Sequence, residues 1–141
     1  MAVTVVAARQ MVGDVATFLI LASPNDTANL TVATLKTFYA PYKFLVTSVR
    51  AGLAAFPSGD PAMVDILING VSMFDTVITI DQFTITSRVA STPYVFSSGF
   101  GSGGNIIQDG DKIEIVVTQV GSSSPGKGLH VAFKGTFETE W

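Results

Sequence analysis

Short runs in which apolar and polar residues alternate recur about every ten residues, and this period-two pattern constrains the fold more than any other feature of the chain. The runs are rich in Val, Ile, Thr and Phe, which favour strands, and no stretch has a sustained apolar period of 3.6 residues. We expect about eight strands, joined by loops too varied in length for a simple meander. The pattern predicts an all-β fold, a two-sheet jelly-roll sandwich with Greek-key connections.

Asn69-Gly70 is the clearest local signal, because it lies between two apolar runs. Both residues accept the positive φ angles of a type I′ turn, so we expect a two-residue hairpin in which Ile68 faces Val71. The alternation then changes phase, which predicts a bulge at residues 75–76.

Other apolar runs end at clusters of turn-forming residues and give further strands. The run from Val15 to Ala22 is continuous, so it predicts a buried strand. Alternation also predicts strands in four segments: 30–39 before Pro41, 44–49, 113–118 after an Asp-Gly-Asp turn, and 128–141. The glycine-rich residues 97–104 predict a mobile surface loop.

The chain is poor in charge, with 13% charged and 48% hydrophobic residues, against about 25% charged in an average domain. Its longest apolar run, 15–22, is far shorter than the roughly 20 residues that cross a bilayer, so we expect no membrane span. Arg9, Gln10 and Asp14 interrupt any secretion signal. Burial of the excess apolar surface between subunits would keep such a chain soluble, which predicts an oligomer.

The length of 141 residues corresponds to a single domain. We expect residues 1–14 to form an N-terminal arm or edge strand and residues 15–141 to form the jelly roll. The net charge is −3 and the eight Lys and Arg residues are spread singly, so neither nucleic acid nor a charged membrane surface is an expected partner.

The chain has few residues suited to catalysis or metal binding. Cysteine is absent, His130 is the single histidine, and no Gly-x-Ser-x-Gly motif is present. Asp109 and Asp111 flank Gly110, a spacing that favours a turn over a calcium site because no later Glu completes the ligand set. The glycines of 99–104 lack the strand, helix and Lys-Ser/Thr pair of a phosphate loop. We therefore expect no catalytic residue, no cofactor and no bound metal.

Large aromatic side chains are the best candidates for contacts with a partner, since aromatic residues dominate binding energy at interfaces. The candidates are Phe18, Phe56, Phe100 and Trp141. Core packing is the competing explanation for each of them. Trp141 is the strongest candidate because it lies at the end of the sequence.

Four segments, 36–53, 64–81, 91–98 and 109–136, together cover about half of the sequence. They resemble a jelly-roll module of structural proteins in tailed bacteriophages. This resemblance implies a trimeric head-decoration, cement or fibre-tip protein without catalytic residues. The sequence departs from the module at residues 82–88 and in the loop after Ser98, where the resemblance would place partner specificity.

The resemblance, the compact size and the lack of a shaft favour a capsid decoration or cement protein. Such a protein would form a homotrimer, bind the major capsid protein and lie on the capsid surface of the virion. The main alternative is a receptor-binding, fibre-tip or tail accessory protein, whose exposed loops such as 97–105 would meet a host glycan or protein. A third reading, a carbohydrate-binding module, has less support because the chain has one Trp and three Tyr.

Overall fold

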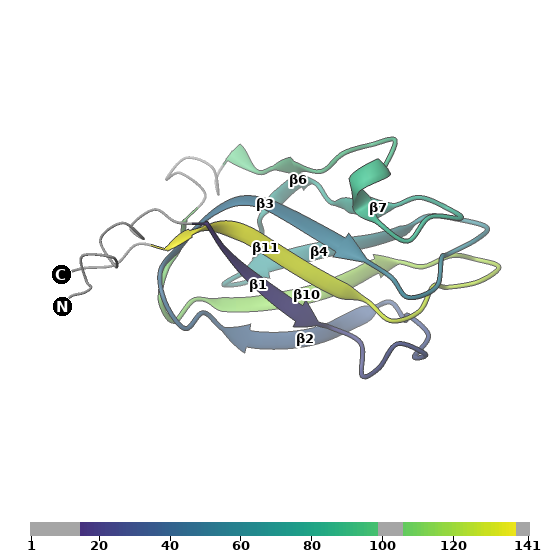
Figure 1. Cartoon of the computed structure of the whole chain (residues 1–141), viewed down its shortest axis with the longest axis horizontal. Coiled ribbons are helices and arrows are strands. Elements are labelled where there is room, and N and C mark those ends of the chain that lie inside the picture. Colours follow the sequence, from purple (N-terminus) through teal and green to yellow (C-terminus); the bar gives the residue numbers. More distant parts are fainter. Residues whose placement is uncertain (1–14, 99–105, 138–141) are drawn as a thin grey trace.

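The computed structural model describes residues 15–98 and 106–137, and side chains within 20–98 and 106–136 (Figure 1). Expectations for residues 1–14 and for the loop at 99–105 therefore lie outside the described residues. In chain order the elements are β1 (Val15–Leu21), β2 (Ala33–Tyr39), β3 (Phe44–Gly52), β4 (Ala62–Ile68), β5 (Val71–Ser72), β6 (Phe74–Thr76), β7 (Ile78–Ile80), the 3-10 turn η1 (Ser87–Val89), β8 (Val95–Phe96), β9 (Ile106–Ile107), β10 (Lys112–Gln119) and β11 (His130–Phe137).

The long strands form two stacked antiparallel sheets (Figure 1). The order is β1-β11-β3-β9 in one sheet and β2-β10-β4-β5 in the other, where β7 continues the edge beside β4. The chain crosses from one sheet to the other between β1 and β2, β2 and β3, β3 and β4, β9 and β10, and β10 and β11. This order is that of a jelly roll with Greek-key connections, as the alternating pattern predicts.

The core lies between the two sheets and follows the alternation seen in the sequence. In β10 the side chains of Ile113, Ile115 and Val117 are buried while Glu114 is half-buried. In β11 Val131 and Phe133 are buried in the same way. These residues belong to one continuous hydrophobic cluster, so the described part of the chain has a single core.

A bulge shifts the register between β3 and β11 and explains a break in the alternation of β3. Lys134 pairs with Ser48, whereas Gly135 pairs with Val46, so Thr47 is the extra residue. A Cβ atom at position 135 would overlap the carbonyl oxygen of Leu45, so only glycine fits here. This close approach of the two backbones keeps Val46 and Val49 both in the core.

The Asn69-Gly70 hairpin has the predicted register. Asn69 and Gly70 have φ angles of 53° and 84°, and Ile68 pairs with Val71. The expected bulge follows, and it is larger than one residue. Three residues separate Val64 from Ile68, but six separate their partners Ile78 and Val71.

The extra residues of this bulge leave the sheet edge as β6, which pairs with β8. Asp65 stabilises the gap they leave: its Oδ1 accepts hydrogen bonds from the Ser72 hydroxyl at 2.6 Å and from the Ile66 N–H at 2.8 Å. Phe74 in β6 stacks on Phe96 of β8 and meets the ring of Tyr94 edge-on. The bulge therefore positions Tyr94 and the segment before β8 over the side of the sandwich.

The prediction of a buried strand at residues 15–22 is wrong in one respect. β1 is an edge strand that pairs only with β11 among the described strands, and the side chain of Leu21 is exposed, although Ala22 after the strand is buried. A continuous apolar run is typical of a strand covered on both faces, but it does not fix the strand's place in the sheet.

The loops at one end of the sandwich are held together by backbone hydrogen bonds. We call this the loop end: residues 22–32, 53–61, 81–86 and 120–129, on the right in Figure 1. Ser58 N–H donates to the Ser124 carbonyl at 3.0 Å, and Ala54 N–H donates to the Lys127 carbonyl at 2.8 Å. These bonds tie the β3–β4 loop to the β10–β11 loop, so the loop end is an ordered surface.

Within the described residues, no helix has the length and apolar character needed to cross a bilayer.

Candidate functional site

Only one of the four aromatic candidates has a described side chain. Phe56 is 47% exposed on the loop end, and its ring meets that of Phe83 edge-on with centroids 5.5 Å apart. Phe18 lies in β1 with its backbone opposite Phe133, and its side chain is outside the described set. Phe100 and Trp141 also lie outside the described residues.

Phe83, which the sequence does not single out, is the more exposed member of the pair at 66%. Its φ angle of 63° places it in the left-handed region, which is unfavourable for a bulky side chain. Two hydrogen bonds hold the segment: Phe83 N–H donates to the Pro57 carbonyl at 3.0 Å, and Gly59 N–H donates to Gln82 Oε1 at 2.8 Å. A strained backbone that presents an apolar ring to solvent is more typical of a binding surface than of a packing role.

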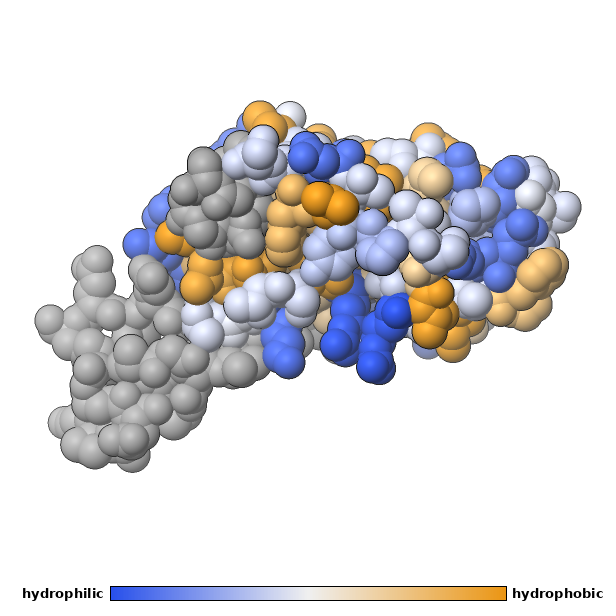
Figure 2. All heavy atoms as spheres, turned by 90° about the horizontal axis from the view of Figure 1, so that it is seen from above, coloured by the Kyte–Doolittle hydropathy of each residue, from blue (hydrophilic) through white to orange (hydrophobic). Residues whose placement is uncertain are grey.

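Two more exposed apolar side chains follow Phe83 along the chain. Ile85 and Val89 follow Phe83 on the same segment, and both are at least half exposed. Figure 2 shows hydrophobic atoms among hydrophilic ones at the right-hand end of the molecule, where the loop end lies. We call Phe56, Phe83, Ile85 and Val89 the apolar loop group.

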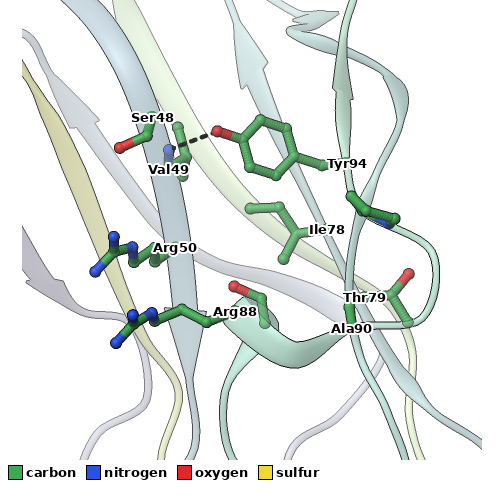
Figure 3. Close-up of a pocket in the computed structure, with 10 residues that line it drawn as sticks. Ser48, Val49, Arg50, Ile78, Thr79, Arg88, Ala90 and Tyr94 are labelled. Carbon is green, nitrogen blue, oxygen red and sulfur yellow. Dashed lines mark hydrogen bonds between the residues drawn. The ribbon is translucent and has the colours of Figure 1, made fainter.

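A pocket of 260 Å³ lies beside the loop end, between β3, β7, η1 and the segment that leads to β8 (Figure 3). Ile78, Val49, Ala90 and Pro93 give it apolar walls. The polar lining comes from Ser48, Arg50, Thr79, Ser87, Arg88 and Tyr94. The fold brings these residues together because the loop at 81–86 turns the chain back along the edge of β3, and the pairing of β8 with β6 holds it there.

Hydroxyl groups cover the edge of β3 inside this pocket. β9 pairs with β3 only at Phe44 and Leu45, and beyond it, among the described residues, this edge meets only an isolated bridge between Gly52 and Thr86. The Tyr94 hydroxyl accepts a hydrogen bond from Val49 N–H at 3.0 Å, drawn as a dashed line in Figure 3. The Ser87 hydroxyl accepts one from Ala51 N–H at 3.0 Å. Each hydroxyl keeps its own proton, which it can donate to another group.

Arg50 from β3 and Arg88 from η1 form the basic side of the pocket. Both side chains are exposed, and in Figure 3 they extend in the same direction, away from Tyr94. Neither guanidinium group makes an ion pair or a side-chain hydrogen bond within the part of the chain that the structure describes. The pocket therefore carries two positive charges without a counter-charge from those residues.

The side chains of His130 and Asp111 contact other groups of the protein. The Nε2 atom of His130 lies 3.5 Å from Asp26 Oδ1, at the surface of the sandwich. The predicted turn at 109–111 is confirmed, since Gly110 has a φ of 86°. Both carboxylate oxygens of Asp111 are engaged there, because Oδ2 accepts from Gln108 N–H at 2.8 Å and Oδ1 from Asn69 Nδ2 at 2.9 Å.

Among residues 15–98 and 106–137, no three His, Asp or Glu side chains are grouped so that they could hold a metal ion.

Comparisons of the chain with protein-family models, with curated proteins and with solved structures give no match. The class that the fold defines is an all-β jelly-roll sandwich with an apolar loop group and a basic pocket.

Proposed function

We propose that this chain is a non-enzymatic structural protein of a bacteriophage virion, a decoration or cement protein that trimerises on the capsid surface and cross-links capsid subunits. The observation that carries this proposal is the apolar loop group on a rigid, charge-poor jelly roll. The resemblance of four segments to a tailed-phage module gives it its biological setting. The Nε2 atom of His130 lies near the surface carboxylate of Asp26, so this histidine has a structural contact.

The apolar loop group provides a contact between copies of the chain. Full burial of a Phe side chain contributes about 1.5–3 kcal/mol, so covering the exposed parts of Phe56 and Phe83 would contribute roughly 1–2 kcal/mol each. The hydrogen bonds that order the loop end reduce the entropy lost on association. In a trimer this gain is repeated at every interface, because closed symmetry uses the same surfaces in each copy.

The mechanism is mechanical. A trimer at a symmetric site would bury capsid surface that the bare shell leaves exposed, and this burial would oppose the outward pressure of packaged DNA.

Light scattering of the purified full chain tests the oligomer. We expect a mass close to three times the 14.8 kDa of one chain. The double variant Phe56→Ser with Phe83→Ser should shift the mass toward a single chain. Val71→Ser is the matched control, since Val71 is 69% exposed on the hairpin at the opposite end of the sandwich. A monomeric wild type at micromolar concentration would refute the trimer.

Cryo-electron microscopy of the source particle tests the location. The proposal expects density for the chain at symmetric positions on the head. Density restricted to the tail would replace it with the receptor-binding or tail accessory function, which the basic pocket favours.

A further inference from the structure

We propose that the pocket between β3, η1 and residues 90–94 binds an acidic sugar, a pyranose ring that carries a carboxylate. This inference does not depend on where the protein lies in a virion, because both a decoration protein and a receptor-binding protein can hold a saccharide. It rests on three features of the pocket: the charge at its rim, the hydroxyls in its wall and the apolar side chains beneath them.

The rim supplies the carboxylate site. Arg50 and Arg88 line the same pocket from two different elements and extend in the same direction (Figure 3). Two like charges placed together repel each other, and no acidic side chain among the described residues offsets that repulsion. A planar guanidinium group matches a carboxylate by paired hydrogen bonds, so an anionic ligand between the two side chains would turn the repulsion into attraction.

The wall supplies partners for sugar hydroxyls. Tyr94 and Ser87 accept hydrogen bonds from the β3 backbone and retain protons to donate. In a strand the carbonyl of a residue points to the same side as its N–H, so the carbonyl oxygen of Val49 also faces this edge. The wall therefore offers both donors and an acceptor, an arrangement that suits a polyhydroxylated ring better than a bare inorganic anion.

Thr79 gives independent support. Thr79 lines the pocket and is only 7% exposed, yet its hydroxyl makes no hydrogen bond within the described residues. Buried polar groups in proteins nearly always have a partner. A ligand hydroxyl, or a water held with the ligand, would supply one here.

The size and the apolar floor limit the ligand to about one sugar unit. The volume of 260 Å³ lies just below the roughly 300–1,000 Å³ of pockets for drug-sized molecules. Ile78 and Val49 are fully buried beneath the opening, while Pro93 and the half-buried ring of Tyr94 line it. Pro93 and the Tyr94 ring would contact the C–H face of a pyranose while its carboxylate meets the arginines.

Titration of the full-length protein followed by amide NMR shifts tests the proposal. D-glucuronic acid and N-acetylneuraminic acid are the two probes, because each carries a carboxylate on a pyranose ring. We expect saturable shifts at residues 48–51 and 87–94 with at least one of them. D-glucose lacks the charge and acetate lacks the ring. Each should therefore bind at least about tenfold more weakly than the acidic sugar, since each loses one class of contact.

Variants at the rim give a second readout. Arg50→Gln and Arg88→Gln should each weaken binding of the acidic sugar about tenfold, the effect of losing one charge-assisted contact. Lys36→Gln is the matched control, because Lys36 is exposed on β2 of the other sheet and should leave binding unchanged. Equal binding of acetate and the sugars, equal binding of glucose, no binding of either probe, or unchanged affinity in both arginine variants would overturn the proposal.

Discussion

The hydroxyl of Tyr94 substitutes for a neighbouring strand at the edge of β3, and its removal measures what that substitution contributes. In Tyr94→Phe the ring keeps its contacts with Phe74 and Phe96, at centroid distances of 5.3 and 5.1 Å. The change deletes one hydrogen bond, from Val49 N–H at 3.0 Å. The variant therefore isolates the energy of that bond.

The structure sets the expected magnitude. A buried N–H left without a partner costs about 1–3 kcal/mol. Val49 N–H faces the 260 Å³ pocket, where a water can take the place of the hydroxyl, so the loss should fall at the low end, about 1 kcal/mol. With a slope of about 1–3 kcal/mol per molar urea, the midpoint of unfolding should fall by about 0.3–1 M.

Urea unfolding and hydrogen exchange provide the assay. The Val49 amide should exchange faster in Tyr94→Phe, while amides in the centre of β10 change only by the global loss of stability. Tyr39→Phe is the matched control, because Tyr39 is 64% exposed on β2 and should change stability by less than about 0.5 kcal/mol. Unchanged protection at Val49 together with an unchanged midpoint would refute this account of the β3 edge.

Two further substitutions test the core and the bulge. Phe133→Ala removes a ring that is 1% exposed between the sheets, so it should lower the free energy of unfolding by about 3–5 kcal/mol. Val71→Ala, at a position 69% exposed on the hairpin, should change it by about 0.5 kcal/mol or less, and equal midpoints in urea would contradict the assignment of the core. Gly135→Ala places a Cβ against the Leu45 carbonyl, whereas at Gly110 an added Cβ meets open space and only the positive φ is unfavourable. Gly135→Ala should therefore destabilise the fold by several times the roughly 1 kcal/mol expected for Gly110→Ala. Thermal unfolding followed by circular dichroism compares the two variants, and similar melting temperatures would show that the backbones at the bulge are not in close contact.

The local sequence pattern predicts those strands and turns whose conformation is determined by residues close together in the chain. Asn69-Gly70 fixes the hairpin through its φ angles, and the alternation of Ile113, Ile115 and Val117 fixes which face of β10 is buried. The phase change after Met73 likewise predicts the bulge. These features depend on residues a few positions apart, so they can be read without knowing which strands pair.

The candidate site depends on contacts that no local pattern contains. Of the aromatic candidates, Phe56 is on the surface as expected, but its partner Phe83 lies in a segment without clear alternation. A positive φ in a phenylalanine has no signal in the sequence, because it arises from the packing of 81–84 against the β3–β4 loop. The charge of Arg50 and Arg88 is visible in the sequence, but their shared pocket is not.

The amino-acid order alone determined that this chain forms short strands, where most of them begin and end, and which side chains point inward, because turn chemistry and period-two alternation act over neighbouring residues. Tertiary structure decided that β1 is an edge strand, that residues 87–94 cover the open side of β3, and that two arginines line one pocket. The physical reason is that exposure and partnership depend on which distant strands become neighbours, and this is set by burial of the whole core rather than by any one segment.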